Sequence, residues 1–347
     1  MRFGLGVPTA TEGMMYPVPF ASPDEAVRLA VTAEELGFDS VWGNDHLTTQ
    51  QYVRAEFAEP PRFYDPVGYL NFVAARTERI RLATCILVLS FRHPAVVAKQ
   101  IATLDQLSGG RAVLGVGIGA YREEYEACWP GVALNRGEHA QESLEALDAL
   151  FTQRRASYSG KWVSFQDVES FPKPLQSPMP VLSGGNAPAS RRRAALLATG
   201  WLPACLTVGE LASGVAEIRA IAAEHGRELP AGFEIAPQFA VSLGRTEEEA
   251  MTRFERSQVC AHLRSLGAST LKGRPEAFGE RNLIGTPEQV RTRVAELAAA
   301  GVDTCSGLLF ACNTVEETLE AMRLFAREVI EPCRDVVAFP KQATVGA

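Results

Sequence analysis

The hydrophobic pattern of the chain alternates between short, almost continuously apolar runs and longer segments with a helical period. In the segment 23–37, for example, the apolar residues at 26, 29, 30, 33 and 36 fall on one face of a helix. Eight apolar runs are each followed by a helical segment, and they cover 3–8, 39–43, 80–90, 112–119, 180–185, 200–206, 233–244 and 302–310. Short apolar strands that alternate with helices predict a parallel sheet covered by helices.

Eight strand–helix units in a chain of 347 residues predict an α/β fold, a (β/α)8 TIM-like barrel with insertions after several strands. An open doubly wound sheet is the competing arrangement. Insertions interrupt the alternation near 9–22, 47–65, 120–135, 154–178 and 264–285. Most of them follow a strand, so we expect them to extend the loops at the end of the barrel where such enzymes carry their active sites.

The same alternation predicts the extent of the domain. We expect a single barrel domain over residues 1–335, followed by a C-terminal tail over 336–347. Within the fourth insertion, the stretch "ASYSGKWVSF" (156–165) predicts a small hairpin with Ser159 and Gly160 at its turn.

Composition and charge narrow the class of protein. Hydrophobic residues make up 46% of the chain and charged residues 22%, which is typical of a soluble globular protein. The net charge of −7 argues against nucleic acid and anionic membranes as partners, because both select basic surfaces. The one compact basic run, Arg191–Arg193, lies in a helical segment, where we expect a solvated helix face.

The cysteines and the length of the apolar runs indicate whether the protein has a metal site or a membrane span, and in which compartment it is found. The seven cysteines show no C-x-x-C pair and no zinc-site spacing with histidine, so we expect no metal site. No apolar run approaches the roughly 20 residues of a membrane span. The first residues, "MRFGLGVP", predict a strand rather than a signal peptide. We therefore expect a cytoplasmic protein.

Three glycines, Gly115, Gly117 and Gly119, end the fourth apolar run in "AVLGVGIG". Their G-x-G-x-G spacing differs from the G-x-G-x-x-G of dinucleotide-binding folds, so the match to that motif is weak. Glycine lets a backbone approach a neighbour that a side chain would block. The neighbour is either a flat ring or the packed interior of the barrel.

The fifth apolar run ends in "PVLSGGNAPAS", where Gly184 and Gly185 precede a helix. Asn186 is expected to cap that helix, and Pro188 falls in its first turn. Exposed amides at a helix N-terminus bind anions, and glycines let a phosphate come close. We favour phosphate binding here over an ordinary strand-to-helix turn.

Asp45 and His46 follow the second apolar run in "SVWGNDHLTT" (40–49). Polar residues also follow the third run in "VLSFRHPAV" (88–96), and the glycines follow the fourth and fifth. A shared pocket at the barrel top is the economical explanation for four such strand ends. The remaining histidines lie in helical stretches, where surface or packing roles are expected: His139, His225 and His262.

Five blocks of the sequence, spread over roughly residues 1–330, resemble the luciferase-like family of flavin- and deazaflavin-dependent oxidoreductases. The blocks are "AEELGFDSVWGNDHL", "ERIRLATCILVLSFRHPAVVAKQIATLDQLSGGRAVLGVGIG", "YREEYEA", "FPKPLQSPMPVLSGGNAPASRRRAALLATGW" and "GTPEQVRTRVAELAAAGVD". The resemblance implies a TIM-like barrel, commonly a homodimer. It also implies that coenzyme F420 or FMN binds across the C-terminal ends of the strands.

The resemblance also implies roles for individual residues. Asp45 and His46 are placed beside the cofactor ring as the catalytic pair, with Asp45 orienting His46. The Leu89–Ser90 region corresponds to a strand end that often carries a non-prolyl cis peptide behind the ring. The remaining cofactor contacts implied by the resemblance lie along the ring edge or at the phosphate: Ile118, Gly119, Gly184, Gly185 and Asn186.

One departure from the family pattern matters. Deazaflavin-dependent sugar-phosphate dehydrogenases of this family carry a proton-donating glutamate directly after the glycine that matches Gly119, and this chain has Ala120 there. Glu123 and Glu124 follow in "YREEY", where we expect them to face water. A sugar-phosphate dehydrogenase is therefore disfavoured.

Three functions remain open. The first is hydride transfer between F420 and a small organic substrate, with His46 holding or protonating the substrate. The second is an FMNH2-dependent monooxygenase that acts through a peroxyflavin, is supplied by a partner reductase and is closed by the 264–285 segment. The third is a non-catalytic flavin-binding protein.

The insertions offer two hints about the substrate. Arg54 and Arg62 could pair with an acidic substrate. Aromatic residues in the insertions make an apolar or aromatic small molecule the alternative, and they are Tyr16, Phe57, Phe63, Tyr64, Tyr121 and Trp129. Packing of the loops onto the barrel explains the aromatic residues equally well.

Overall fold

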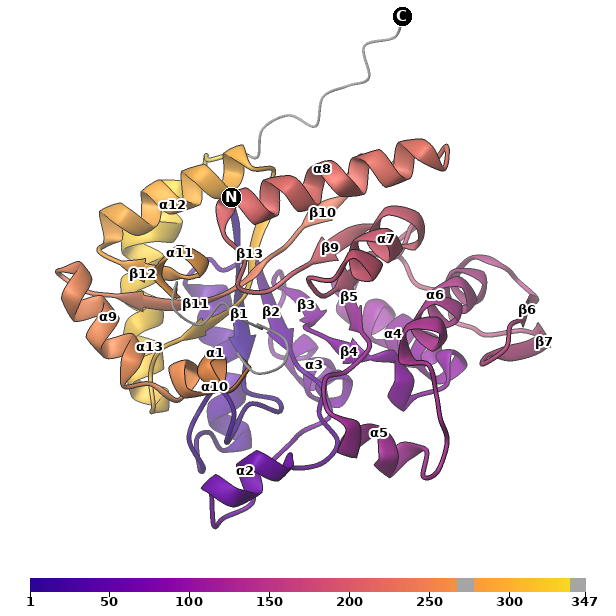
Figure 1. The fold of residues 1–347 in the computed structure, drawn as a ribbon, viewed down its shortest axis with the longest axis horizontal. Coiled ribbons are helices and arrows are strands. Elements are labelled where there is room, and N and C mark those ends of the chain that lie inside the picture. Colours follow the sequence, from indigo (N-terminus) through magenta and orange to yellow (C-terminus); the bar gives the residue numbers. More distant parts are fainter. Residues whose placement is uncertain (267–277, 338–347) are drawn as a thin grey trace, which may run out of the picture.

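A curled sheet of parallel strands forms the centre of the computed structural model, which describes residues 1–266 and 278–337 (Figure 1). Its strands are β1 (Arg2–Val7), β2 (Ser40–Gly43), β3 (Arg81–Thr84), β4 (Leu87–Val88), β5 (Ala112–Gly117), β8 (Val181–Gly184), β9 (Gly200–Leu202), β10 (Glu234–Ile235), β11 (Gln238–Leu243), β12 (Leu283–Gly285) and β13 (Thr304–Phe310). Neighbouring strands follow the order β10-β9-β8-β5-β3-β2-β1-β13-β11-β12, and β4 pairs with β5.

Helices surround this sheet. They are α1 (Pro23–Glu35), α2 (Gln51–Glu56), α3 (Pro66–Ala74), α4 (Pro94–Ser108), α5 (Arg122–Cys128), α6 (Arg136–Thr152), α7 (Pro188–Leu197), α8 (Val208–Glu224), α9 (Glu247–Glu255), α10 (Gln258–Leu266), α11 (Phe278–Arg281), α12 (Pro287–Ala299), α13 (Val315–Phe325) and α14 (Glu331–Cys333). A 3-10 turn, η1 (Leu89–Phe91), precedes α4, and a π-helical turn, η2 (Ala326–Ile330), follows α13.

The stretch 234–243 closes the barrel, because its two halves pair with different neighbours. β10 pairs with β9, whereas β11 pairs with β13. The backbone N–H of Gln238 donates to Pro203 O at 2.8 Å, and that of Ser306 donates to Pro237 O at 2.9 Å. The described strands thus fill eight positions of a parallel barrel, with β12 added outside β11. The predicted barrel is confirmed, and the open doubly wound sheet is wrong.

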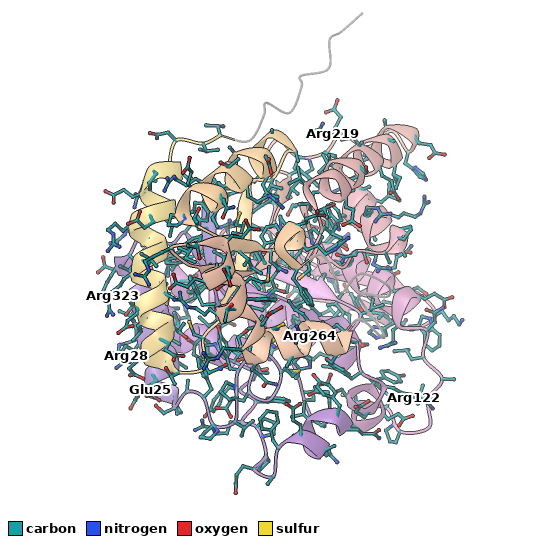
Figure 2. The ribbon with its side chains drawn as sticks, turned by 60° about the vertical axis from the view of Figure 1, so that its left-hand side comes forward. Glu25, Arg28, Arg122, Arg219, Arg264 and Arg323 are labelled. Atoms are coloured by element: carbon teal, nitrogen blue, oxygen red, sulfur yellow. The ribbon has the colours of Figure 1, made fainter. Side chains whose placement is uncertain are left out.

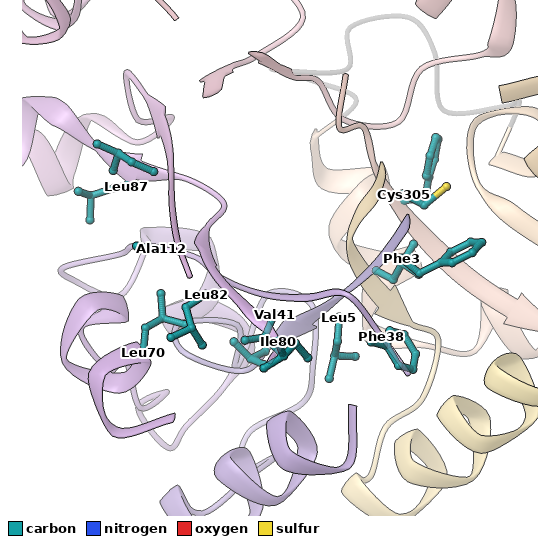
Figure 3. Close-up of a cluster of buried hydrophobic side chains, with 14 of the residues drawn as sticks. Phe3, Leu5, Phe38, Val41, Leu70, Ile80, Leu82, Leu87, Ala112 and Cys305 are labelled. Carbon is teal, nitrogen blue, oxygen red and sulfur yellow. The ribbon is translucent and has the colours of Figure 1, made fainter. Parts of the chain in front are cut away.

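Successive residues of the strands face the barrel interior and the helices in turn, as the period of a strand requires. Val41 packs under the helices, while the next residue, Trp42, fills the interior with Ala83 and Leu182. Figure 3 shows the outer layer, in which Leu5, Val41 and Leu82 lie between the strands and the surrounding helices. The helices are therefore held by an apolar layer on the outer face of the sheet.

The insertions take different forms. Figure 1 shows α2 and α5, from the 47–65 and 120–135 insertions, at the end of the barrel opposite the N-terminus. The predicted hairpin is confirmed: β6 (Ala156–Ser159) and β7 (Ser164–Val168) pair antiparallel, and β6 packs against α6. Residues 267–277 of the fifth insertion and 338–347 of the tail lie outside the described residues. So does the closing role expected of the 264–285 segment.

Charged side chains cover the outside of the molecule. Arg28 of α1 and Glu316 of α13 form a surface ion pair at 2.8 Å. Figure 2 shows Arg122, Arg219 and Arg323 at the periphery. Across the described ranges, no helix has the length and apolar character needed to cross a bilayer.

Candidate active site

Asn44 and Asp45 lie directly after β2, and the side chain of each forms hydrogen bonds with a neighbouring loop. The Asn44 amide receives a hydrogen bond from Ala10 N at 3.2 Å and donates one to Ala10 O at 2.6 Å, which fixes the loop after β1. The Asp45 carboxylate, 2% exposed, accepts hydrogen bonds from Val88 N at 2.9 Å and from both terminal nitrogens of Arg92. Asp45 therefore holds the turn that follows β4, and its oxygens are occupied.

His46, the next residue, is oriented by Glu124. Its Nδ1 lies 3.1 Å from both carboxylate oxygens of Glu124, whose side chain is fully buried. The same carboxylate accepts a hydrogen bond from Leu47 N at 2.9 Å. A carboxylate only accepts, so Nδ1 carries a proton and Nε2 keeps a lone pair when the ring is neutral.

Two expectations about this pair are corrected. Asp45 does not orient His46, since its oxygens go to Arg92 and Val88. Glu124 does not face water, because the side of α5 that carries it is buried against the loop after β2. Glu123 lies closer to the surface and accepts from the backbone of α2.

The end of the third strand differs from the expected geometry. The non-prolyl cis peptide joins Cys85 and Ile86, four residues before Leu89 and Ser90. Leu89 and Ser90 instead form the η1 turn, with 1% and 0% of their surface exposed. The Ser90 carbonyl accepts a hydrogen bond from Trp129 Nε1 at 2.7 Å. Both side chains are buried in this turn, and their predicted contact with a cofactor ring stays a prediction.

The glycines of β5 and β8 accommodate the barrel's own atoms. A Cβ on Gly117 would lie 2.6 Å from the Ile86 side chain, and one on Gly184 would lie 2.7 Å from it. A Cβ on Gly115 would lie 2.1 Å from Thr84 O. Of the two explanations for Gly115 and Gly117, packing of the barrel interior is the one that the contacts support.

Ile118 and Gly119 continue from β5 at the rim of the barrel. Ile118 is partly buried against the main apolar core, and its carbonyl lies 3.5 Å from Ser90 Oγ. Gly119 has a φ of +74°, a conformation that favours glycine, and its carbonyl accepts from Arg136 at 3.0 Å. The predicted contact of both residues with a ring edge stays a prediction.

The turn between β8 and α7 differs in one respect from the sequence prediction. The N-cap of α7 is Ala187, which provides no side-chain hydrogen bond, and Pro188 occupies the first turn as expected. Asn186 instead exchanges two hydrogen bonds with Ala204, at 2.8 and 3.0 Å, and so ties the ends of β8 and β9 together. Gly185 has a φ of +111°. The first turn of α7 thus has no side-chain cap. Pro188 has no N–H and Ser190 N donates to Ala187 O, so in this turn Ala189 has the backbone N–H without a hydrogen-bond partner among the described residues.

The basic run on α7 is only partly solvated. Arg192 is exposed, but Arg191 bonds to Glu217 at 2.7 Å and to the Asn186 carbonyl at 2.6 Å. Arg193 is 9% exposed, and burial lowers the pKa of its guanidinium. The prediction of a solvated helix face is wrong for Arg193, because its side chain is buried and donates to Ser190 Oγ at 3.3 Å.

A cluster of aromatic and imidazole rings lies beside His46. Tyr121 and Phe63 approach the His46 ring, with centroid separations of 5.7 and 5.8 Å. The Tyr52 hydroxyl lies 3.4 Å from that of Tyr121 and 3.2 Å from Nδ1 of His262. His262 is 5% exposed, and burial lowers its pKa to about 4. A cavity of about 110 Å³ lies between α10, which carries His262, and the ends of β8, β9, β11 and β13.

Sequence reasoning missed Glu124, Tyr52 and His262. A signal for Glu124 exists, because residues 121, 124, 125 and 128 fall at the i, i+3, i+4 and i+7 positions of one helix face. That face carries Tyr121 and Tyr125, so the pattern favours burial of Glu124 over Glu123. The contact between Tyr52 and His262 spans 210 residues and leaves no local signal.

Comparison with known proteins agrees with this architecture. The family model described as luciferase-like monooxygenase matches residues 1–304. An F420-dependent glucose-6-phosphate dehydrogenase from Microbacterium testaceum is 34% identical over 183 residues, which is 52% of each chain. The chain thus matches about half the length of that relative. An FMNH2-dependent dimethylsulfone monooxygenase from Pseudomonas putida is 29% identical over 303 residues, covering 79% of this chain and 82% of the relative.

Solved structures show the same fold. A monooxygenase from Streptomyces bottropensis superimposes with a TM-score of 0.77 at 25% identity, covering 96% of this chain and 99% of the other. An F420-dependent secondary alcohol dehydrogenase, solved with an F420–acetone adduct, gives a TM-score of 0.74 at 18% identity, with coverage of 95% and 98%. Since the family model covers most of its length, the chain belongs to the luciferase-like monooxygenase family.

Proposed function

We propose that this protein is an oxidoreductase that transfers a hydride between coenzyme F420 and a small organic substrate. One observation carries the chemical part of this function. His46 stands at a strand end with Nδ1 held by the buried Glu124, and its Nε2 makes no hydrogen bond within residues 1–266 and 278–337. A histidine held in this way is equipped to exchange a proton with a substrate.

The residues present fit a cofactor that carries a phosphate. The first turn of α7 has no side-chain cap, and Gly184 and Gly185 precede it without side chains. Gly185 cannot be replaced without strain, since its φ is +111° and a Cβ would lie 2.7 Å from Ser190 Oγ. We therefore assign Gly184, Gly185 and Asn186 to the phosphate end of the cofactor, and Ile118 and Gly119 to its ring edge.

The protein's own contribution is the movement and placement of a proton. When bound, reduced F420 supplies a hydride to a carbonyl carbon, and oxidised F420 accepts one from an alcohol. His46 Nε2 takes the hydroxyl proton as the alcohol's C–H hydrogen leaves with its electron pair, and it returns the proton in the reverse direction. Glu124 stabilises the imidazolium that forms, because its carboxylate accepts from Nδ1 in both states.

An FMNH2-dependent monooxygenase is the second candidate. The alignment with the dimethylsulfone monooxygenase favours it, since it covers 79% of this chain against 52% for the dehydrogenase. This function requires a partner that supplies reduced FMN. The third candidate, a non-catalytic flavin-binding protein, has no need of the buried Glu124–His46 pair.

Equilibrium binding of F420, FMN and reduced FMN separates these candidates. We expect micromolar or tighter binding of F420 and negligible binding of FMN. The Gly185→Val variant should lose this binding, while Gly209→Ala, which meets nothing within 4 Å, should keep it. Preference for reduced FMN would move the assignment to the monooxygenase. Binding of neither cofactor would overturn both, together with the phosphate assignment.

We also propose that the protein is cytoplasmic and forms a homodimer. All seven cysteines are free of disulfides, which suits a reducing cytoplasm. We propose a homodimer and a single barrel domain over residues 1–335. Light scattering of the purified protein tests the dimer, with a mass near 75 kDa expected from two chains of 37.6 kDa (2 × 37.6 = 75.2).

A further inference from the structure

Helices α3 and α4 lie side by side on the outside of the barrel and expose a patch of large apolar side chains (Figure 1). A loop runs along α4, where Gln106 Nε2 donates to Lys173 O at 2.8 Å. Among the described residues, nine large apolar side chains are exposed, and five of them lie on these two helices and this loop. We call these five the α3–α4 face, and they are Phe72, Val96, Leu107, Phe171 and Leu175, each 50–68% exposed. Apolar patches of this kind mark interaction sites.

Neither helix exposes a carboxylate, although the net charge of the chain is −7. α3 has no charged residue. The acidic residue of α4, Asp105, is 0% exposed and accepts hydrogen bonds from Leu175 N at 2.7 Å and Gln176 N at 3.1 Å. Other outer helices do expose acidic side chains, for example Glu224 of α8 and Glu316 of α13. Two copies of this acidic chain repel each other elsewhere, whereas on this face they approach without a like-charge cost.

The outward positions of α4 have a two-fold pattern. At helical spacings of four, three and four residues, one stripe along the helix is formed by Val96, Gln100, Thr103 and Leu107. The stripe has the same order of apolar and polar residues in both directions. If two α4 helices pack antiparallel about an axis between residues 101 and 102, Val96 of one copy meets Leu107 of the other, and Gln100 meets Thr103. Such self-complementarity is the property of an interface between identical subunits.

The same two helices carry two buried amide oxygens, Asn71 Oδ1 on α3 and Gln100 Oε1 on α4, without a hydrogen-bond partner among the described residues. An unpaired oxygen of this kind destabilises an isolated subunit. Gln100 lies next to the axis of the stripe, so a rotation of its side chain brings the amide to a second copy. A polar side chain near the centre of a helix pair fixes the register of the two helices.

We propose that a second copy of this chain binds the α3–α4 face, with the two α4 helices antiparallel about a two-fold axis. This inference names the interface of the homodimer proposed above and rests on that proposal. The face lies on the outside of the barrel and includes neither His46 nor the residues assigned to the cofactor. Dimerisation therefore leaves the active site of each copy open to its ligands.

Sedimentation velocity over a concentration series tests the face. Leu107→Glu places an unpaired charge in an apolar interface, so the dissociation constant of the dimer should rise about 100-fold or more. Val132→Glu is the matched control, because Val132 is 47% exposed on the loop between α5 and α6, and it should dimerise as the wild type does. Circular dichroism verifies that each variant is folded. A dimer that resists Leu107→Glu, or that Val132→Glu weakens equally, would overturn the assignment.

Two double variants test the antiparallel arrangement. Val96→Lys combined with Leu107→Glu should dimerise within about tenfold of wild type, because opposite charges then face each other across the axis. Val96→Cys combined with Leu107→Cys should cross-link two copies on oxidation with diamide, with wild type and the single variants as background. Within one copy the two positions lie about 16 Å apart along the helix, too far for a disulfide. Absence of both the rescue and the cross-link would show that the helices do not pair in this way.

The sedimentation series also separates this inference from the proposed cofactor. If the dimer forms and responds to Leu107→Glu but F420 does not bind, the cofactor is wrong and the inference stands. If the wild type stays monomeric at high micromolar concentration, the face and the homodimer are both wrong, whether or not F420 binds. Binding of such a monomer to phosphatidylcholine vesicles would then identify a lipid surface as the occupant of the face.

Discussion

At the N-terminal end of the barrel, both oxygens of the buried Glu234 carboxylate have hydrogen-bond partners, whereas at the C-terminal end two buried polar atoms, on Thr11 and Gln50, have none among the described residues. Glu234, 4% exposed, bonds to Arg81 through both oxygens at 3.1 Å, to Arg2 at 3.2 Å and to Thr304 at 2.6 Å. At the other end, Thr11 Oγ1 and Gln50 Oε1 are buried without a hydrogen-bond partner.

This difference between the two ends of the barrel suggests that one end stabilises the fold and the other binds the ligand. A saturated ion-pair network at the starts of β1, β3, β10 and β13 holds these strands together and offers nothing to a ligand. Unpaired buried atoms cost stability, typically about 1–3 kcal/mol each, and persist where a ligand can satisfy them. Such atoms also occur on the outer helices, at Asn71 Oδ1 of α3 and Gln100 Oε1 of α4, so the proposed site at the C-terminal end rests on the His46–Glu124 pair rather than on unpaired atoms alone.

The largest expected effect is loss of turnover on removing His46. His46→Ala should lower kcat for cyclohexanol oxidation by about 10²–10⁴-fold, the usual contribution of a general base. F420 affinity and thermal stability should change little, and His225→Ala serves as the control. A variant that keeps more than a tenth of wild-type kcat would remove His46 from the mechanism.

At the opposite end, Glu234→Gln should affect stability alone. Breaking a buried ion pair costs about 3–5 kcal/mol, and we expect about 2–3 kcal/mol here because Arg81 and Arg2 are partly exposed, at 24% and 41%. Urea unfolding measures the change, and Glu316→Gln in the surface pair with Arg28 should cost less than 1 kcal/mol. A loss of F420 binding in Glu234→Gln would contradict the separation of the two ends.

The same carboxylate predicts a pH dependence of stability. The Arg81 and Arg2 guanidiniums and the hydrogen bond from Thr304 outweigh burial and hold the pKa of Glu234 below its ordinary value of 4.5. Its stabilising contribution is therefore present above pH 4.5 and is lost as the pH falls through the lowered pKa. The difference in unfolding free energy between wild type and Glu234→Gln should shrink below pH 4.5, and a constant difference down to pH 2 would be contrary evidence.

Glu124→Gln tests the link between α5 and His46. An amide can present either its oxygen or its nitrogen to Nδ1, so the ring proton is no longer confined to that atom. We expect kcat to fall about tenfold with KM little changed, and the 15N shifts of His46 to report a mixture of tautomers. Wild-type kcat with a single tautomer would leave Glu124 a purely structural residue.

The smallest effect is expected at Gln50. Its Oε1 is buried and unpaired, so Gln50→Leu should raise the unfolding free energy by up to about 1 kcal/mol. The substitution also replaces the amide that packs beside the His46 ring, 3.2 Å from Nδ1, so the ring is held less firmly and activity should fall modestly. Destabilisation by more than 1 kcal/mol in urea unfolding would show that Oε1 is satisfied in solution.

Most of the fold could be predicted because strands buried on both faces leave continuous apolar runs. All eight runs occupy barrel positions, and the helical periods mark the helices between them. The interruption of 80–90 at the Cys85–Ile86 bond could not be predicted, since the run is apolar throughout. The role of Asn186 could not be predicted either, since its partner Ala204 lies two residues after the end of β9.

The site was predictable only where its residues end strands. His46 and the Gly184–Asn186 turn lie where the pattern places them, because C-terminal strand ends meet at one rim. The hydrogen-bond partner of His46 could not be predicted from the residues next to it in the sequence. Its neighbour Asp45 binds Arg92, and His46 binds Glu124, which lies 78 residues further along the chain. Neighbours in sequence at the end of a strand project in different directions, so they serve different partners.

Three consecutive residues at the end of β2 therefore hold three different segments of the barrel rim. Asn44 holds the segment after β1, Asp45 holds the turn after β4, and His46 is joined to α5. Each segment is anchored to the end of β2 by its own residue, and the segment after β1 is also bonded to the 47–65 insertion, since Glu12 accepts a hydrogen bond from Arg62 N at 2.9 Å. A sequence grafted into 9–22 to change the substrate range should therefore keep Glu12, because its partner Arg62 precedes Phe63, whose ring lies 5.8 Å from that of His46.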